Sequence, residues 1–342
     1  MMDLNKEMVK IKKKVDSLIL KDLLPQSDEV GEVNVLYKMM RDYPARPAKG
    51  LRPFICTTSC GAFGGKIEDA LLTAAAIELF QNWILIHDDV EDGSLMRRGR
   101  PALHVMYDWT LAINAGDALH ARMWKALLAN RLKLGAKKAM TLMDEFSKIV
   151  EETTEGQHIE LGWVVGKKWD LTQGDYYTMC LKKTAWYTTI GPMRLGAIVA
   201  GASGRALDML VEIGTKLGVG FQIHDDVLNL SGDEKYGKEI ADDLLEGKRT
   251  LILIKALNSC TRSEKKRIVS VLNKKREEKT VREVREVLSL IKKYGAIEAA
   301  SQEAVDLVGE ARGMLNRLHL DGDRRYAQLL DETARFLVER NW

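Results

Sequence analysis

The chain has 342 residues, 46% of them hydrophobic, and can therefore bury a large core. Its 52 basic and 49 acidic residues nearly balance, which argues against a nucleic-acid-binding protein. Its four cysteines are too few and too scattered for a disulfide framework, which favours a reducing, cytoplasmic compartment. We expect these cysteines to be small buried side chains and not ligands of a zinc ion.

The N-terminal segment has the pattern of an amphipathic helix. Three consecutive lysines, 12–14, lie among apolar residues at helical spacing, without the apolar core of a secretory signal. Further along, the most apolar stretch is Ala70–Ile86. Polar residues such as Glu78 interrupt it, and it is shorter than the roughly 20 apolar residues that a membrane span needs. We therefore expect a buried helix there and no membrane span.

Helical periodicity extends over most of the chain, whereas strand-like alternation is scarce. This pattern predicts an all-α fold. None of the Gly- or Pro-containing turns is long enough to be an interdomain linker, so residues 1–342 are expected to form a single helical domain. The clearest helices are expected at Glu68–Asp92, Leu142–Gly162, Arg205–Asn229 and Ala296–Leu318.

The helix expected at Glu68–Asp92 ends in a DDxxD motif. Its residues Asp88 and Asp92 are four apart, so they share a face with Cβ atoms roughly 5–6 Å apart. Acidic side chains at the C-terminal end of a helix oppose its dipole, and we expect a cation outside the helix to compensate. Paired carboxylates that share a cation with substrate phosphates are typical ligands of Mg²⁺. The alternative is a solvated acidic cap.

The pentapeptide Ile-His-Asp-Asp-Val of this motif occurs twice. The copies are Ile86–Val90 and Ile223–Val227, each at the end of a long apolar helix and each followed by a Gly-containing loop. In the second copy Asp225 and Asn229 share a face, and the amide is the weaker ligand. We expect the two helices to meet across a shared cavity.

Basic residues flank both motifs. Any one of them is most often a surface charge, but together with magnesium they could neutralise two diphosphate groups. The chain has no GxxxxGK[ST] loop, so a nucleotide-type phosphate cradle is not indicated. The candidates are Lys49 and Arg52 at a helix start, Arg97 and Arg98 after the first motif, Lys183 beside Thr184 in an apolar helix, and Lys238 and Lys248 after the second motif.

Two other charged segments have simpler interpretations. The stretch Arg262–Glu286 mixes Lys, Arg and Glu, and a solvated helical hairpin is favoured over a binding arm. The string from Glu155 to His158 has the Glu-x-x-His spacing of a di-iron carboxylate bundle, but no second copy exists in the sequence. We expect His158 to be a hydrogen-bonded helix residue.

The order of these motifs resembles the trans-isoprenyl diphosphate synthases, the farnesyl and geranylgeranyl diphosphate synthase family. The similarity runs from about Lys49 to Thr250. Its blocks are Ile84–Pro101, which resembles the first aspartate-rich region, the pair Lys183-Thr184, and Phe221–Asp226 and Glu246–Thr250, which resemble the second aspartate-rich region and the lysine after it. The resemblance implies an isoprenoid synthase fold around a deep central cavity, a magnesium-dependent prenyltransferase and a homodimer.

The resemblance also implies roles for individual residues. Asp88, Asp92 and Asp225 would bind magnesium, about three ions per active site, while Asp89 and Asp226 would support these ligands or bridge to basic groups. The metal and the cations would stabilise the leaving diphosphate while the isopentenyl double bond attacks the allylic cation. The allylic diphosphate would be held by Arg97, Lys183, Thr184, Gln222, Lys238 and Lys248, and isopentenyl diphosphate by Lys49, Arg52, Gln81 and Arg98.

The sequence departs from the family pattern at a few positions. Gln81 stands where many members have a histidine, Gly50 replaces a common arginine, and Asn229 replaces the last aspartate of the second motif. Gln157 and Glu160 resemble the Gly-Gln-x-x-Asp-Leu segment of a cavity-facing helix, with glutamate for aspartate. An ordinary solvated acid is the alternative for Glu160.

Product length in this family depends on residues shortly before the first aspartate. Here Trp83 and Ile84 precede Asp88 by five and four positions, and DDxxD has no two-residue insertion. A single aromatic residue at this place resembles archaeal geranylgeranyl synthases, so we expect geranylgeranyl diphosphate. For Trp83 the alternative is a simple core residue, and for the product the alternative is farnesyl diphosphate.

Two further functions compete with this interpretation. A class I terpene cyclase also uses DDxxD but needs no second diphosphate site, and Lys49, Arg52 and Arg98 favour condensation. A weakly active subunit of a hetero-oligomeric synthase is the other candidate. Such a subunit is expected to have a degraded aspartate motif, and the first motif of this chain is complete.

Overall fold

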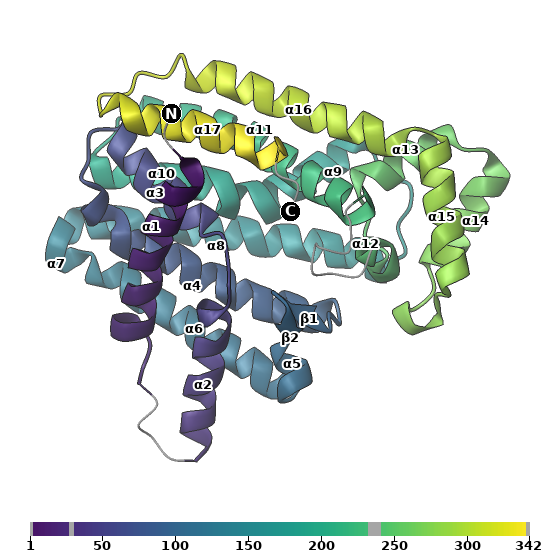
Figure 1. Ribbon diagram of the computed structural model, residues 1–342, viewed down its shortest axis with the longest axis horizontal. Coiled ribbons are helices and arrows are strands. Elements are labelled where there is room, and N and C mark those ends of the chain that lie inside the picture. The colour runs from purple at the N-terminus through teal and green to yellow at the C-terminus, as the bar shows by residue number, and fades with distance from the viewer. Residues whose placement is uncertain (1–2, 27–30, 232–240, 340–342) are drawn as a thin grey trace. The chain divides into compact units, whose positions relative to one another are not determined.

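The computed structural model describes residues 3–26, 31–231 and 241–339. These residues are almost entirely helical (Figure 1), and their strands are two short segments, β1 (Met96–Arg97) and β2 (Arg100–Pro101), paired antiparallel. The all-α fold class expected from the sequence is confirmed. The chain divides into two compact units, each described separately below, and the single domain expected from the sequence stays a prediction.

Unit 1 comprises Met1–Ile149, Tyr187–Val211 and Leu318–Thr333. Its long helix α4 packs against α3 and α6, and α3 packs in turn against α10 (Figure 1). The elements that lie wholly in this unit are α1 (Leu4–Leu18), the π-helix η1 (Ile19–Leu23), α2 (Glu32–Ala45), α3 (Leu51–Ala62), α4 (Ile67–Glu91), β1, β2, α5 (Leu103–Met106), α6 (Trp109–Ala129), α7 (Arg131–Leu134) and α10 (Gly191–Ala200).

Small residues let the helices of unit 1 approach closely. Helix α3 is buried along its whole length, and the free thiols of Cys56 and Cys60 are completely buried, as expected for small core residues. A Cβ on Gly196 of α10 would lie 2.1 Å from the carbonyl oxygen of Cys56. Only glycine therefore allows α10 to pack on α3 at this distance.

Helix α4 is the buried helix expected between Ala70 and Ile86. Its central turns are buried, including the charged Glu78, which is 5% exposed. Within the described ranges, α4 is the one helix long and apolar enough to cross a membrane, and 61% of its most apolar window is buried inside the protein. The charged end of α4, not its apolar middle, carries the first aspartate motif.

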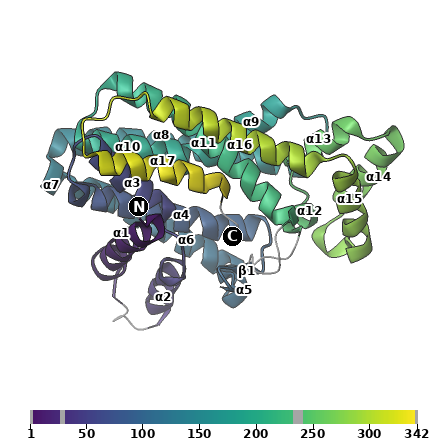
Figure 2. The same ribbon diagram turned by 45° about the horizontal axis from the view of Figure 1, so that its top comes forward.

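Unit 2 comprises Val150–Trp186, Glu212–Arg317 and Ala334–Trp342. Helices α9, α15 and α16 pack against α13, and α14 and α15 form a helical hairpin (Figure 2), which confirms the interpretation of the charged stretch as a hairpin. The elements that lie wholly in this unit are α9 (Gln173–Cys180), α12 (Asp242–Glu246), α13 (Leu251–Ser259), α14 (Arg262–Leu272), the 3-10 helix η4 (Arg276–Glu278), α15 (Val281–Lys293) and α16 (Ala296–Leu315).

Four helices contribute residues to both units. They are α8 (Ala136–Val165), the π-helix η2 (Leu181–Ile190), α11 (Gly204–Ser231) and α17 (Arg324–Glu339). The helices expected at Leu142–Gly162 and Arg205–Asn229 are thus confirmed as parts of α8 and α11. The π-helical winding of η2 was not expected, and such segments are often found at functional sites.

Candidate active site

The first aspartate motif ends helix α4 in unit 1. Asp92 caps the helix and donates its backbone N–H to the carbonyl oxygen of Asp88 at 2.8 Å, so the two residues lie one turn apart. Both side chains are half-buried. Two carboxylates on one face at a helix C-terminus supply oxygen ligands where the helix dipole also favours a cation, and this donor set fits magnesium.

Asp89 is buried and is held by two partners. The Tyr43 hydroxyl donates to its carboxylate, and Arg97 Nε donates to Oδ1 at 2.8 Å. Burial and the charge of Asp89 raise the pKa of the Tyr43 hydroxyl, which keeps it protonated as a donor. Burial lowers the pKa of Arg97, but Asp89 and then Asp88, 3.5 Å away, raise it overall. Asp89 thus bridges the motif to a permanent cation.

The β1–β2 hairpin that carries Arg97 and Arg98 is fixed by Arg46, a residue without a predicted role. Arg46 is buried and donates to the carbonyl oxygens of Arg97 at 2.7 Å and Pro101 at 2.8 Å. Its Nε donates to Asp42 at 2.6 Å. Arg46 therefore satisfies the backbone of the turn and orients both arginines on it.

Both arginines expected to bind isopentenyl diphosphate are fixed in unit 1. Arg52 is 7% exposed, donates to Thr188 Oγ1 at 2.8 Å and lies over the ring of Tyr187, 4.2 Å from its centroid. Arg98 donates to the carbonyl oxygen of Tyr43 at 3.0 Å and lies 3.4 Å from the amide oxygen of Asn82. These are rigid cations, because neighbouring groups restrict their rotamers.

The remaining isopentenyl candidates are Lys49 and Gln81, both half-buried. Gly50, between Lys49 and the start of α3, has φ +67°, and a Cβ there would lie 3.0 Å from the side chain of Lys12. The left-handed conformation explains why glycine, and not the arginine common in the family, suits this position.

The second aspartate motif lies in the part of α11 that belongs to unit 2. Thr184 Oγ1 donates to Gln222 Oε1 at 2.7 Å, and Gln222 Nε2 donates to Asp226 Oδ1 at 2.8 Å. The Tyr176 hydroxyl donates to the other oxygen of Asp226 at 2.7 Å. These four side chains place the Lys-Thr pair and the second motif in one hydrogen-bonded chain beside Asp225.

Acidic neighbours surround Asp226. Its burial, the charge of Asp243 and that of Asp225 raise its pKa well above the ordinary value, although the bonds from Tyr176 and Gln222 oppose this shift. Asp225 is half-buried, whereas Asp226 is 5% exposed. Of the two adjacent carboxylates, Asp225 is therefore the more exposed one.

Lys183 sits on the π-helix η2 against α8. Its Nζ donates to Glu160, which is 8% exposed, so Glu160 is a paired, buried acid and the solvated alternative is wrong. Gly156 allows this packing, because a Cβ there would lie 2.1 Å from the backbone nitrogen of Lys183. On the outer side, Glu155 is exposed and accepts from Lys182 at 2.6 Å, as expected of a surface residue.

The segment after the second motif is anchored by Asn229 and Glu246. Asn229 Oδ1 accepts from the backbone N–H of Asp243 at 3.2 Å, so this amide positions helix α12. Lys248 Nζ lies 2.7 Å from Glu246 Oε2. Lys238, the other lysine expected here, lies outside the described residues.

The residues expected to set product length lie on α4 in unit 1. The half-buried Trp83 belongs to an aromatic cluster with Phe80, 5.5 Å away, and His120 of α6, 4.1 Å away between ring centroids. Ile84 is half-buried beside it. The side of α4 that carries Trp83 therefore faces α6.

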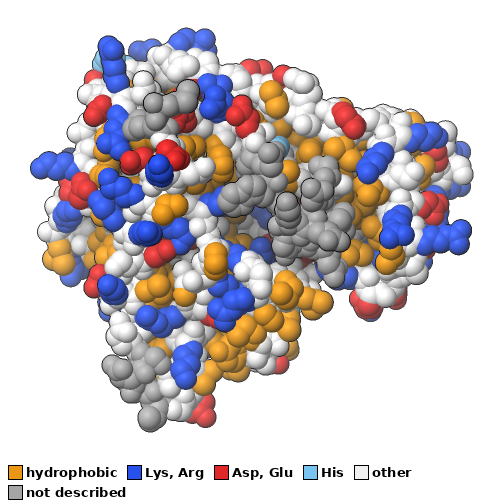
Figure 3. Space-filling view, in the orientation of Figure 1, with side chains coloured by type: hydrophobic (Ala, Val, Ile, Leu, Met, Phe, Trp, Pro, Cys, Tyr) orange, Lys and Arg blue, Asp and Glu red, His pale blue; other side chains and the backbone are white. Residues whose placement is uncertain are grey.

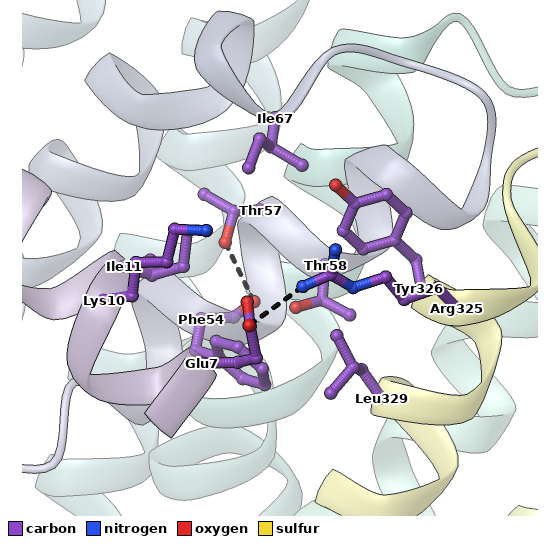
Figure 4. A pocket seen from close by; sticks show the side chains of 10 residues that line it. All are labelled: Glu7, Lys10, Ile11, Phe54, Thr57, Thr58, Ile67, Arg325, Tyr326 and Leu329. Carbon is purple, nitrogen blue, oxygen red and sulfur yellow. Dashed lines mark hydrogen bonds and ion pairs between the residues drawn. The ribbon is translucent and has the colours of Figure 1, made fainter. Parts of the chain in front are cut away.

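A cavity of about 50 Å³ lies elsewhere in unit 1, between α1, α3 and the start of α17 (Figure 4). Glu7 and Arg325 form an ion pair at its edge, 2.9 Å apart, and none of the predicted site residues lines it. The cavity is too small for a prenyl chain.

Over residues 3–26, 31–231 and 241–339, no three His, Cys, Asp or Glu side chains converge as metal ligands.

Sequence reasoning missed several residues that orient the predicted ones. Tyr43 and Arg46 lie about 50 positions before the groups they contact. Tyr176 lies 50 positions before Asp226, and Thr188 lies 136 positions after Arg52. No motif spacing signals such partners. Asp243 is the exception, because it forms an acidic pair with Asp242 shortly before Lys248, and such a pair could have marked it as a candidate site residue.

Comparisons with known proteins agree with the motif order. The family model described as polyprenyl synthetase matches residues 33–291. The chain is 36% identical to the geranylgeranyl diphosphate synthase of Sulfolobus acidocaldarius over 311 residues, 91% of this chain and 92% of that protein. The crystal structure of the geranylgeranyl pyrophosphate synthetase from Pyrococcus horikoshii matches with a TM-score of 0.85 and 32% identity over 98% of each chain. A Corynebacterium glutamicum geranylgeranyl pyrophosphate synthase, complexed with isoprenyl diphosphate and magnesium, matches with a TM-score of 0.88 and 25% identity over 99% of this chain and 100% of that chain.

Proposed function

The chain belongs to the polyprenyl synthetase family and is a short-chain trans-prenyltransferase, and we propose that it condenses isopentenyl diphosphate with allylic diphosphates to geranylgeranyl diphosphate. The observation that carries this proposal is the pair of fixed cations Arg52 and Arg98 in the unit that bears the first aspartate motif. A second diphosphate needs such cations, whereas an enzyme that only ionises an allylic diphosphate does not.

We infer that Asp88, Asp92 and Asp225 hold magnesium, in about three ions per site. When bound, the metal neutralises charge on the departing diphosphate. The oxygen-only donor set supports this assignment, as does the magnesium named for the Corynebacterium glutamicum relative. Asp89 keeps Arg97 beside Asp88, so that a cation and the metal ligands lie together.

The allylic diphosphate is proposed to bind Arg97, Lys183, Thr184, Gln222 and Lys248, and Lys238 as well. Lys183 and Lys248 each have a glutamate partner, Glu160 and Glu246, which fixes the ammonium groups before a substrate arrives. These groups stabilise charge as the carbon–oxygen bond breaks, and preorganised cations contribute most when they need no rearrangement.

Isopentenyl diphosphate is proposed to bind Lys49, Arg52, Gln81 and Arg98. Its double bond attacks the allylic cation, and the proton lost afterwards passes to the released diphosphate. We propose that Trp83, which packs against Phe80 and His120, helps to keep water away from the cation.

We also propose a homodimer in the cytoplasm. Apolar side chains are exposed on β1, α5 and the start of α6, where hydrophobic groups gather in Figure 3. Exposed apolar side chains that gather in one region suit a protein interface. The four cysteines are free thiols, which fits a reducing compartment. Light scattering on the purified chain should give twice the monomer mass.

The test is an assay of product length with isopentenyl diphosphate and each allylic starter in the presence of Mg²⁺. We expect consumption of isopentenyl diphosphate and a geranylgeranyl end point. A farnesyl end point would refute the product assignment. Allylic turnover without isopentenyl consumption would identify a cyclase, and turnover only after a partner is added would identify a subunit of a hetero-oligomer.

Variants of the motif give a matched control. Asp88→Asn should reduce kcat by about a hundredfold or more, since it weakens charge stabilisation in the transition state. Glu91→Gln removes one charge from the same helix end but from an exposed side chain, and should retain activity within about threefold. Equal losses in both variants would mean that only the summed charge of the motif matters.

A further inference from the structure

The hairpin of α14 and α15 in unit 2 concentrates the positive charge of the chain. Residues Arg262–Lys293 contain twelve Lys or Arg and five Glu, a net charge of +7. The whole chain carries only +3, so the rest of the molecule is net negative. Several basic side chains are visible over these helices in Figure 3. A local excess of positive charge of this size produces a positive electrostatic potential that the small net charge of the whole chain does not indicate.

Helical geometry sorts the charges of this hairpin. The inner faces bury apolar residues, among them Ile268 and Val271 of α14 and Val287 and Ile291 of α15. Exposed residues at helical spacing form the outer faces. We name this surface the outer basic face, and its charged members are Arg262, Lys266, Arg267, Arg282, Arg285, Lys292 and Lys293, with Glu286 the one acid among them.

The acids of the two helices are already neutralised within the hairpin. Glu286 accepts from Arg267 at 2.8 Å, which also joins the exposed faces of the two helices. Glu264 accepts from Lys293 at 2.7 Å and Glu283 from Lys274 at 2.7 Å. These bonds lower the pKa of all three carboxyl groups, so they stay ionised and paired.

Several cations of the outer basic face are left over. Arg262, Lys266, Arg285 and Lys292 are exposed and form no ion pair with any described residue. Long basic side chains on two adjoining helices can reach a flat surface together. Small polar residues, Ser263, Ser270 and Ser289, lie between them in the sequence and would not obstruct such an approach.

We propose that the outer basic face docks the enzyme on an anionic lipid surface. Clustered Lys and Arg residues bind anionic headgroups through their summed field. Nucleic acid is the competing polyanion, but sites for single strands interleave basic with aromatic residues, and Arg262–Lys293 contains no aromatic residue. The choice of lipid also rests on the proposed function, because a geranylgeranyl diphosphate product is an amphiphile that partitions into membranes.

The test is co-sedimentation of the full chain with vesicles. Wild type should bind vesicles of phosphatidylglycerol and phosphatidylcholine at low salt, bind pure phosphatidylcholine weakly, and dissociate as salt increases. Each basic residue near an anionic surface strengthens binding by a factor of about five. The quadruple variant Arg262→Gln, Lys266→Gln, Arg285→Gln and Lys292→Gln should therefore bind at least about tenfold more weakly.

A control variant removes the same charge from exposed positions of unit 1. Lys38→Gln, Lys125→Gln, Arg131→Gln and Lys137→Gln should change vesicle binding by less than about twofold. Equal weakening in both variants, or no binding of wild type to anionic vesicles, would overturn the proposal. Binding to a single-stranded oligonucleotide that is as tight and equally lost in the hairpin variant would assign the face to nucleic acid.

Synthase activity with water-soluble substrates separates this proposal from the proposed function. Both quadruple variants should retain kcat and KM, because neither touches a predicted site residue. A failure of vesicle binding with normal synthase activity would refute only the docking surface. An absence of synthase activity in wild type, with normal vesicle binding, would refute only the function.

Discussion

The indole ring of Trp83 stacks on the imidazole of His120, with ring centroids 4.1 Å apart and planes inclined by 22°. Trp124 Nε1 donates to His120 Nε2 at 2.9 Å, so the imidazole is fixed from both sides. Burial lowers the pKa of His120, which keeps the ring neutral near pH 7 and able to accept this bond. The stacked imidazole thus holds the indole of Trp83 in place, five residues before Asp88.

If Trp83 sets product length, truncation of its side chain is expected to lengthen the product. Trp83→Ala removes the bulk of the indole, and we expect prenyl products longer than geranylgeranyl to become the main species. Chromatography of the dephosphorylated prenyl alcohols measures the shift. Trp124→Phe removes the hydrogen bond but keeps an aromatic ring, and should leave the distribution unchanged. An unaltered distribution for Trp83→Ala would place this residue in the core alone.

The stacking of Arg52 on Tyr187 is expected to affect one substrate selectively. Arg52→Lys loses the planar fork, and the KM for isopentenyl diphosphate should rise about tenfold. Tyr187→Leu removes a cation–π contact of about 1 kcal/mol and should raise the same KM about fivefold. The KM for the allylic substrate should change less than twofold in both variants. A parallel rise of both KM values would show a general loss of structure.

The C-terminus of α8 offers a stabilising substitution. Lys167 has φ +50°, and the backbone bonds from Lys167 N to Val164 O (3.1 Å) and from Lys168 N to Trp163 O (3.0 Å) form a Schellman motif. A non-glycine residue in this conformation costs roughly 1–2 kcal/mol. Lys167→Gly should therefore raise the free energy of unfolding by about 0.5–1 kcal/mol, after the larger freedom of glycine in the unfolded chain is subtracted.

Urea denaturation measures this gain. Lys168→Gly is the matched control, because it removes the same side chain one residue later, where φ is not positive. That control should be neutral or destabilising. A lower denaturation midpoint for Lys167→Gly than for wild type would contradict the expectation.

Lys279 is expected to make stability depend on pH. Burial, and then the charges of Arg249 and Arg276, lower its pKa from 10.5 to about 8 in the folded protein. Between pH 8 and 10.5 the unfolded chain binds the extra proton and the folded chain does not, so stability rises with pH across this window.

The comparison with Lys279→Met isolates this contribution. The difference in the free energy of unfolding, wild type minus variant, should increase by about 2 kcal/mol from pH 8 to pH 10.5. Lys275→Met, at an exposed position of the same connection, should show no such increase. A difference that stays flat across the window would mean that Lys279 is charged in the folded protein throughout.

The sequence was sufficient to predict the long helices because their apolar periodicity reflects burial on one face. Ile67–Glu91 and Ala296–Leu315 lie within a few residues of the expected ranges. The π-helical winding of Leu181–Ile190 was not predictable, since no motif or spacing in the sequence distinguishes it from an α-helix. The division into two units was likewise not predictable, because the sequence contains no linker that would mark a boundary between them.

The candidate site was predictable only where its residues lie close in sequence. Asp88 and Asp92 on one helix face follow from a spacing of four. Their supports do not, because Tyr43 contacts Asp89 across 46 positions of the chain. The burial of Glu160 could not be predicted from composition. An acid in a charged helix is usually solvated, yet this one is buried against Lys183.

Gly156 has a consequence for mutagenesis of this enzyme. Its missing side chain leaves room for the backbone of Lys183, so even Gly156→Ala would push the lysine away from its place. In a deep mutational scan, substitutions of Gly156 should reduce activity as much as substitutions of catalytic residues, although glycine has no side chain that could react. Engineers who redesign the prenyl specificity should therefore leave it untouched.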